Sequence, residues 1–200
     1  MGVRRSEIVR DTKETSIRLM LDLDDNKVED NKIDTGSGFM DHMLTLMAAH
    51  GNFRLDASCK GDTYVDYHHS VEDVGIALGE AFKEALGNKA GITRYGSIIL
   101  PMDETLIMAA IDISGRAYLN FDVSFYSEKI GELDTELIKE FFIAFTRKAE
   151  VTLHFNEIYG ENNHHIAEGC FKAFGRILAQ AVSIDSKDPS KIPSTKGILD

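Results

Sequence analysis

The first third of the chain alternates apolar and polar residues, which is the pattern of strands with one buried face. The clearest stretch is 16–23, where every second residue is isoleucine or leucine. Segments 6–11 and 27–34 alternate in a similar way, so three strands are predicted. The sequence Asp-Asp-Asn at 24–26 supplies turn-forming residues, and we expect it to join the second and third strands as a hairpin.

Apolar positions then change to the spacing of helices, with one face marked every three or four residues. This spacing predicts a helix over 39–50 and a longer one over 70–86, with a short strand over 52–60 between them. Gly51 and Gly87 follow the two predicted helices, a common position for a helix to end. The first half of the chain therefore has the predicted order βββαβα.

The second half of the chain repeats this order. Its residue pattern predicts strands over 96–100, 105–113, 116–123 and 151–156, and helices over 135–149 and 163–181. A period of half the chain favours an internal duplication. We expect one α+β unit made of two βββαβα halves, residues 1–92 and 93–184, followed by a tail at 185–200.

The composition is that of an ordinary soluble globular protein, with 43% hydrophobic and 28% charged residues. Apolar runs such as 107–111 are much shorter than the roughly 20 residues of a membrane helix, and residues 1–10 lack the apolar core of a signal peptide. We expect a cytoplasmic protein without a membrane partner, in which Cys59 and Cys170 are free buried thiols. The net charge of −11 argues against a broad nucleic-acid surface.

Two His-His-x-x-Glu segments are the strongest chemical signal in the sequence. On a helix, residues three and four apart share a face, so a histidine and the glutamate can bind one ion. Adjacent side chains point about 100° apart, so each His-His pair more naturally serves two ions, or one ion and one other partner. One isolated pair would be interpreted as surface or core residues, whereas two matching copies favour metal ligands. The candidate ligands are His68, His69 and Glu72, and 96 residues later His164, His165 and Glu168.

His42 and Glu140 extend this inventory to eight ligands. Each lies near the start of the helix that precedes a His-His pair, 26 residues before His68 and 24 before His164, respectively. Imidazole and carboxylate ligands without thiolate suit Mn, Fe or Zn.

The remaining candidates lie outside this symmetry. His50, at a helix end, is either a core histidine or a donor to an anionic ligand, and His154 is interpreted as structural. A small anion would need only a local cluster of cations, although each of these alone is more commonly a surface charge. The candidates are Arg94, Arg116, Lys172, Arg176 and Lys196.

Four segments, taken in order and spacing, resemble the imidazoleglycerol-phosphate dehydratases of histidine biosynthesis, and the resemblance covers essentially the whole chain. They are Gly-Phe-Met-Asp-His-Met-Leu at 38–44, Asp-Tyr-His-His-Ser-Val-Glu-Asp at 66–73, Gly-Glu-Asn-Asn-His-His-Ile-Ala-Glu at 160–168 and Pro-Ser-Thr-Lys-Gly at 193–197.

The resemblance implies two halves like domain 2 of ribosomal protein S5, with two sheets flanking paired helices. It also implies two metal ions in each active site, usually manganese, with other divalent metals possible. Family members form a homo-oligomeric shell of 24 subunits with active sites between subunits, so the ligands of one site can come from different chains. Many members carry histidine at the position of Glu140, which bears on metal preference.

The resemblance further implies a lyase that removes water from imidazoleglycerol phosphate, giving imidazole acetol phosphate. Glu14 would be its proton-transfer group, and without the resemblance it would be interpreted as a solvated charge at a strand edge. Asp103 would orient or stabilise an intermediate, or only cap a turn. The tail would close the phosphate site as a flap. The expected phosphate-binding residues are His50, Arg94, Arg116, Lys172, Ser194 and Lys196.

Two other functions are compatible with a His-rich metal site. A dinuclear hydrolase acting on a small phosphorylated substrate would use the metals to activate water, and a storage or sensor module would only hold them. The basic residues favour an enzyme over storage. They do not separate a lyase from a hydrolase.

Overall fold

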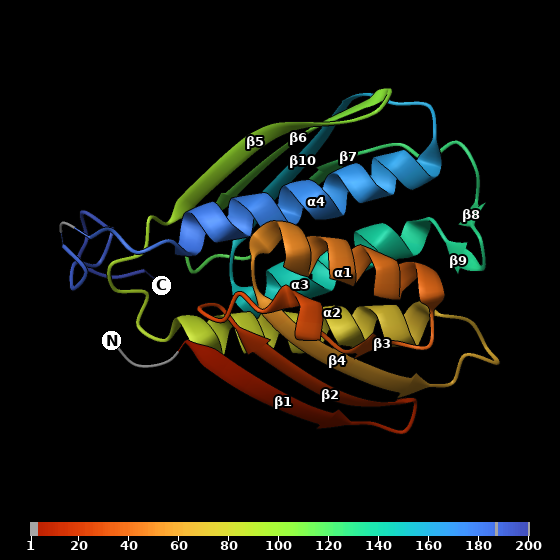
Figure 1. Cartoon of the computed structure of the whole chain (residues 1–200), viewed down its shortest axis with the longest axis horizontal. Coiled ribbons are helices and arrows are strands. Elements are labelled where there is room, and N and C mark those ends of the chain that lie inside the picture. The colour runs from red at the N-terminus through yellow and green to blue at the C-terminus, as the bar shows by residue number, and fades with distance from the viewer. Residues whose placement is uncertain (1–3, 187, 200) are drawn as a thin grey trace.

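Two four-stranded sheets enclose four long helices in the computed structural model, within residues 4–186 and 188–199, which are the residues that the structure describes (Figure 1). The outer ends of the predicted ranges, residues 1 and 200, lie outside this part. The first half contains β1 (Arg5–Asp11), β2 (Thr15–Asp22), a 3-10 turn (Val28–Asp30), β3 (Ile33–Asp34), α1 (Gly38–Gly51), β4 (Arg54–Gly61) and α2 (His68–Leu86). The second half contains β5 (Tyr95–Met102), β6 (Thr105–Asp112), β7 (Tyr118–Asp122), β8 (Lys129–Ile130), β9 (Leu133–Asp134), α3 (Glu136–Ala149), β10 (Thr152–Tyr159) and α4 (Asn163–Val182).

The two sheets have the same topology, which confirms the predicted repeat. Their strand orders are β1-β2-β4-β3 and β5-β6-β10-β7, and in each the first three strands are antiparallel while the fourth lies parallel to its neighbour. Inward-facing residues such as Ile17 and Leu21 of β2, or Ile107 and Ile111 of β6, are buried. The period of two read from the sequence therefore places one apolar face of each sheet against the helices. The short β8–β9 hairpin has no counterpart among the described elements of the first half.

The predicted hairpin between the second and third strands is wrong. The Asp22 carboxylate accepts the backbone N–H groups of Asp24 and Asp25, so these residues form a turn on their own strand end. The chain then crosses the sheet, and Asn31 accepts the backbone N–H of Leu55 in β4. The local residues predict the turn correctly, but hydrogen bonds to a later strand decide where the third strand lies.

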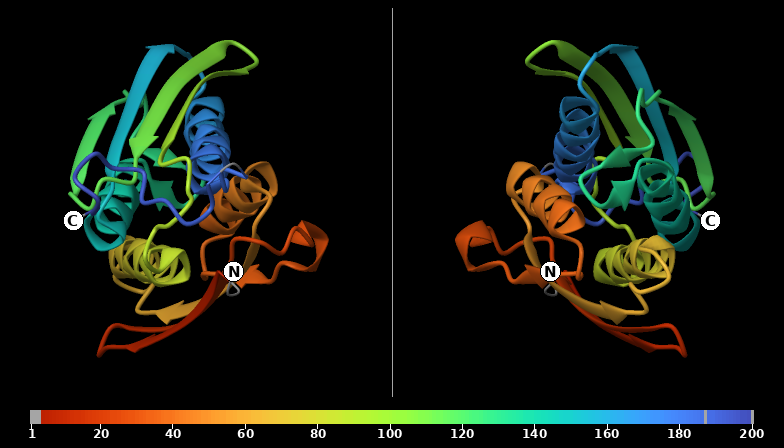
Figure 2. Two further views of the ribbon diagram at one scale, coloured as in Figure 1. Left: turned by 90° about the vertical axis from the view of Figure 1, so that its left-hand side faces the viewer. Right: turned by 90° about the vertical axis from the view of Figure 1, so that its right-hand side faces the viewer.

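The helices pair across the two halves. α1 packs on α4 and α2 packs on α3, and the end views show these two pairs side by side between the sheets (Figure 2). A Cβ at Gly175 of α4 would lie 2.2 Å from the Met47 carbonyl oxygen of α1, and one at Gly79 of α2 would lie 2.7 Å from that of Phe145 in α3. The same close contact therefore occurs in both pairs. Neither half is a separate domain, because each half supplies one helix to each pair.

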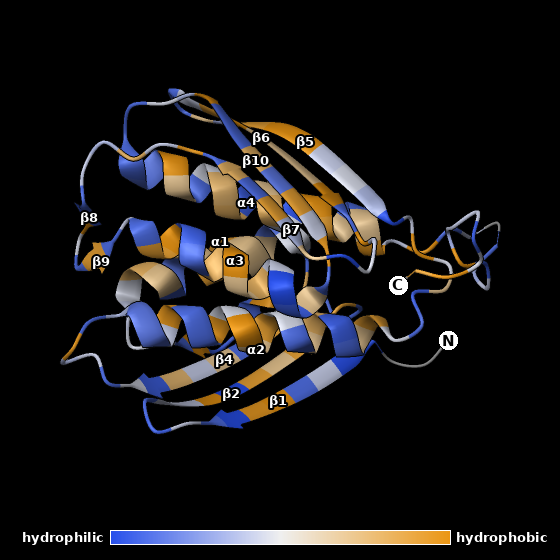
Figure 3. Cartoon of the chain, turned by 180° about the vertical axis from the view of Figure 1, so that it is seen from behind, coloured by the Kyte–Doolittle hydropathy of each residue, from blue (hydrophilic) through white to orange (hydrophobic). Residues whose placement is uncertain are grey.

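The aromatic part of the core lies around α3 and α4. Phe142 contacts Phe155, Phe171 and Phe174, with ring centroids 4.6–5.2 Å apart. Seen from behind, α2 and α3 show hydrophilic and hydrophobic bands, as expected of helices with one buried face (Figure 3). None of the helices in the described part of the chain is long and apolar enough to span a bilayer.

The tail packs beside the connection between the halves. The Gly91 N–H donates to the Lys191 carbonyl, and the Arg94 guanidinium donates to that of Pro193. Ile92 and Ile184 form an isolated β-bridge. The tail therefore lies at the C-terminal end of α4 (Figure 1).

Candidate active site

One group of predicted ligands is assembled within the chain. His42 of α1 and His164 and Glu168 of α4 place nitrogen and oxygen atoms within 4.8 Å of one another. His42 Nε2 lies 2.9 Å from Glu168 Oε1, and His164 Nε2 lies 3.1 Å from the same oxygen. The packing of α1 on α4 brings these residues together from different halves. We call them the α1–α4 cluster.

Glu168 is charged in this environment although it is mostly buried. Burial alone would raise the pKa of Glu168, but hydrogen bonds from Lys172 and His42 outweigh that effect and lower it to about 2. Lys172 Nζ lies 2.5 Å from Glu168 Oε2, one helical turn further along α4. Lys172, predicted to bind phosphate, thus neutralises a predicted metal ligand in this structure.

The second histidine of each pair is held by a carboxylate at Nδ1. Both oxygens of Asp62 lie 3.1 Å from His69 Nδ1, and Glu104 Oε2 lies 2.7 Å from His165 Nδ1. These hydrogen bonds raise the pKa of both imidazoles and lower that of Glu104 to about 2. Neither carboxylate was predicted from the sequence. The available signal was their position in the sequence, because Asp62 directly follows a strand shortly before His69, and Glu104 is next to the predicted Asp103.

Glu14 and Asp103 each lie near the Nε2 atom of one of these histidines. Glu14 Oε1 is 3.8 Å from His69 Nε2, and Asp103 Oδ2 is 3.9 Å from His165 Nε2. Their carboxylates are 55% and 73% exposed. Both predicted catalytic carboxylates therefore lie beside predicted ligands, on the outer surface of a single chain.

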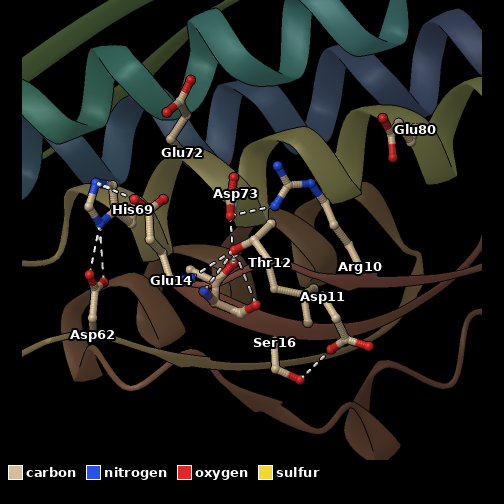
Figure 4. A network of polar contacts seen from close by, with 12 residues as sticks. Arg10, Asp11, Thr12, Glu14, Ser16, Asp62, His69, Glu72, Asp73 and Glu80 are labelled. Atoms are coloured by element: carbon tan, nitrogen blue, oxygen red, sulfur yellow. Dashed lines mark hydrogen bonds and ion pairs between the residues drawn. The ribbon is translucent and has the colours of Figure 1, made fainter.

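The turn that carries Glu14 is held in place by Asp73, on the side that faces α2 (Figure 4). The buried Asp73 carboxylate accepts hydrogen bonds from Thr15 Oγ1 and Arg10 Nη1, each at 2.5 Å. Thr12 Oγ1 accepts the backbone N–H groups of Glu14 and Thr15. The Glu14 backbone thus has a defined position next to α2, which also carries His69.

His68, Glu72 and Glu140 occupy the counterpart positions in the α2–α3 pair, but they do not form an equivalent compact group. Among the residues that the structure describes, the α1–α4 cluster alone meets that criterion. Glu72 Oε1 is instead 3.2 Å from Arg147 Nη2 of α3. His68 lies against His69 with ring centroids 6.2 Å apart. The eight predicted ligands are therefore not gathered around one point in a single chain.

Two cavities flank the α1–α4 cluster. One of about 470 Å³ is lined by Phe39, His42 and Tyr67, and another of about 580 Å³ is lined by Glu104 and Asn163. His164 lines both, and the β8–β9 hairpin lies between them. These volumes are in the range of small-molecule sites.

Most of the predicted phosphate-binding residues lie far from this cluster. The Arg94 backbone N–H donates to the carbonyl of Ala181, 16 residues beyond His165 on α4, which corresponds to roughly 24 Å along the helix. Arg116, whose guanidinium donates to the Ser114 carbonyl, lies at the same end of the sheet. Ser194 and Lys196 follow Pro193, which Arg94 binds. Within one chain these four residues and the metal-ligand candidates are at opposite ends.

His50 lies between these ends and has an unusual environment. Its Nδ1 is buried with no hydrogen-bond partner. Burial, together with the charges of Arg176 and Lys172, lowers the pKa of His50. This arrangement fits a neutral donor next to an anion. His154 instead lies against Tyr118, with ring centroids 5.5 Å apart and the rings tilted by 43°.

The comparisons with known proteins identify the family of the chain. The family model described as imidazoleglycerol-phosphate dehydratase matches residues 35–178. This chain belongs to the imidazoleglycerol-phosphate dehydratase family. It is 54% identical to the enzyme of that name from Oceanobacillus iheyensis over 98% of this chain and 100% of that one. It is 53% identical to that from Caldicellulosiruptor saccharolyticus over the full length of both.

Two crystal structures from the same family share the fold. The dehydratase from Staphylococcus aureus has a TM-score of 0.79 at 38% identity, covering 90% of this chain and 99% of that one. That from Pyrococcus furiosus has a TM-score of 0.82 at 35% identity, covering 96% and 100%. The α+β fold with repeated halves is therefore the fold of the dehydratase family.

The α1–α4 cluster has the donor chemistry of a divalent-metal site. It combines two imidazole nitrogens with a carboxylate that remains ionised, and no thiolate. Such a donor set suits Mn, Fe or Zn. The residues present therefore fit a metal of this kind.

Proposed function

We propose that this protein is a hydro-lyase that dehydrates imidazoleglycerol phosphate to imidazole acetol phosphate in histidine biosynthesis. The family membership of nearly the whole chain supports this reaction. The observation that carries it at the level of residues is the α1–α4 cluster beside two small-molecule cavities. No feature of the site favours the alternative hydrolase.

The proposal includes two divalent metal ions in each active site, namely manganese, the usual metal of the family, with other divalent metals possible. Their ligands are the eight residues predicted from the sequence: His42, His68, His69, Glu72, Glu140, His164, His165 and Glu168. When bound, such ions supply Lewis acidity toward the imidazole ring and the departing hydroxide. The ionised Glu168 would supply a negative ligand. Lys172, which contacts Glu168 in this structure, would contribute its positive charge to binding the substrate phosphate.

In this proposal Glu14 transfers the proton and Asp103 orients the substrate. Glu14 lies on a turn that hydrogen bonds to Asp73 and Thr12 hold in place, so the turn is already ordered for proton transfer before a substrate binds. Its high exposure in one chain leaves it accessible to a substrate held beside His69. Asp103 has the matching position beside His165.

The active site also requires residues from more than one copy of the chain. Four predicted phosphate-binding residues lie at the other end of the chain from the metal-ligand candidates: roughly 24 Å of α4 separates His165 from the Ala181 carbonyl that binds the Arg94 backbone. The four are Arg94, Arg116, Ser194 and Lys196. A single substrate cannot bridge that distance, whereas the opposite ends of neighbouring copies can meet at one site. We propose a homo-oligomer, with 24 subunits as in the family, located in the cytoplasm.

An activity assay tests the reaction. Manganese-loaded protein is incubated with imidazoleglycerol phosphate while the enol or ketone product and free phosphate are both measured. We expect the ketone product and no phosphate release. Phosphate release would support the hydrolase, and no product with verified full metal content would reject the lyase.

A pair of variants tests the role of Glu14. Glu14→Gln is expected to lower kcat by at least about 100-fold, which is the usual contribution of a general base. Glu29→Gln, an exposed glutamate in the 3-10 turn, serves as the control. Equal activity of the two variants would remove Glu14 from the mechanism.

A further inference from the structure

The two halves of the chain differ at the carboxylate that holds the second histidine. Glu14 and Glu104 directly precede Thr15 and Thr105, the first residues of β2 and β6. His69 and His165 occupy the same position in α2 and α4, 96 residues apart. An unbroken repeat would therefore place Glu14 against His69 as Glu104 is placed against His165.

The structure breaks this symmetry. Glu104 reaches His165 Nδ1 at 2.7 Å, while its second oxygen accepts the backbone N–H of Asn162, the residue before α4. In the first half Asp62 holds His69 Nδ1 with both oxygens. Glu14 lies on the other side of the ring, 3.8 Å from Nε2.

The carboxylate that follows the strand before the helix holds the histidine in one half only. Gly61 and Gly160 occupy equivalent positions, because a Cβ at Gly61 would meet Thr15 and Ser70, and one at Gly160 would meet Thr105 and Ile166. The next residue is Asp62 in the first half and the exposed Glu161 in the second. His69 is held by Asp62, whereas His165 is held by Glu104.

We propose that Asp62 and Glu104 are positioning residues that accept the Nδ1–H of His69 and His165, and that Asp62 thereby leaves Glu14 free for proton transfer. Accepting Nδ1–H fixes the tautomer in which Nε2 carries the lone pair, and it also fixes the ring orientation. Both Nε2 atoms are then available to a metal. This inference rests on the proposed metal site, and it assigns opposite roles to two glutamates at equivalent positions.

Manganese affinity, measured on purified full-length protein by titration with Mn²⁺, tests the assignment. Asp62→Ala and Glu104→Ala are each expected to lower Mn²⁺ affinity by about 10- to 100-fold, the usual effect of removing such a partner. Asp62→Asn keeps an acceptor oxygen and should recover most of the loss. Glu14→Ala should retain the wild-type affinity for Mn²⁺, although it also replaces a glutamate by alanine at the position equivalent to Glu104.

Two controls separate the contact from the loss of charge. Asp66→Asn removes a negative charge near His69 while its side-chain oxygen can still accept the His68 N–H. Glu161→Gln removes an exposed carboxylate from the cavity that Glu104 lines. Both should bind Mn²⁺ like the wild type, and a loss equal to that of the alanine variants would overturn the proposal.

The tautomers provide a readout that needs no metal. In metal-free protein labelled with ¹⁵N-histidine, nitrogen chemical shifts should show neutral His69 with its proton on Nδ1 in the wild type. In Asp62→Ala they should show a mixture of the Nδ1–H and Nε2–H tautomers. Wild-type protein that binds no Mn²⁺ would reject the metal site and this inference together. Wild-type binding with unchanged affinity in both alanine variants, or unchanged tautomers in Asp62→Ala, would reject the positioning role alone.

Discussion

His42 Nε2 and Glu168 Oε1 lie 2.9 Å apart although 126 residues separate them along the chain. His42 belongs to the first half and Glu168 to the second, and the contact exists because α1 packs on α4 across the repeat. The cluster is thus a product of how the halves interlock.

Removing His42 should weaken metal binding more than removing another partly exposed histidine. His42→Ala deletes one of three donors in the α1–α4 cluster, and we expect Mn²⁺ affinity to fall at least about tenfold. His154→Ala is the matched control, since that ring lies against Tyr118 on the second sheet. Calorimetric titration compares the two, and equal affinities would mean that the cluster does not bind the metal.

The close helix contact at Gly175 should control both stability and the site. Gly175→Ala places a methyl group against the Met47 carbonyl, which belongs to backbone and cannot move aside without shifting α1. We expect a loss of about 1–3 kcal/mol in the free energy of unfolding and a weaker metal affinity. Gly38→Ala, at the start of α1 with open space around it, should be nearly neutral. Urea unfolding measures both, and a neutral Gly175→Ala would contradict the packing argument.

Thr15→Val should disturb the Glu14 turn without disturbing metal binding. The substitution keeps the shape of the side chain but removes its hydrogen bond to the buried Asp73. We expect unfolding free energy to fall by about 1–3 kcal/mol and kcat to fall more than Mn²⁺ affinity. Ser16→Ala, at a partly buried neighbour whose hydroxyl contacts Asp11 instead, is the control. If Thr15→Val lowered Mn²⁺ affinity as much as kcat, the contact between Thr15 and Asp73 would support the metal site and not only the Glu14 turn.

Both cysteines should be unreactive in the folded protein. Burial raises the pKa of Cys59 and of Cys170, so the thiolate that reacts with disulfide reagents is scarcer than in the unfolded chain. Raising the pH from 7 to 9 should therefore accelerate labelling strongly in denaturant and very little in native buffer. Following the reaction by absorbance checks this. Rapid labelling of either thiol in native buffer at pH 9 would contradict the prediction, because it would show that the thiol is accessible to the reagent in the folded protein.

Mixing two inactive variants tests whether one site uses several chains. Arg94→Ala lacks a predicted phosphate-binding residue, and Glu14→Gln lacks the proton-transfer group. If the two residues in one site come from different copies, mixed oligomers contain some sites with both intact, and activity returns. Sites formed within one chain would always keep a lesion. No recovery after verified subunit exchange would exclude the shared site.

The sequence by itself determined the repeat and the candidate ligands. Alternation in segments such as 16–23 depends only on the two faces of a strand, and His68, His69 and Glu72 match His164, His165 and Glu168 at a fixed spacing. These are local or periodic properties, which a linear pattern preserves. The turn at 24–26 was also recognised, although its partner strand was not.

The tertiary structure decided which of these residues meet. The pairing of α1 with α4 unites His42 with Glu168, and the roughly 24 Å between Arg94 and His165 along α4 divides the phosphate residues from the ligands. Tertiary packing also brings Asp62 to His69 and Glu104 to His165. It places Asp73, on the buried face of α2, against the turn that carries Glu14. Contacts of that kind depend on packing between segments distant in sequence, and no local pattern encodes them.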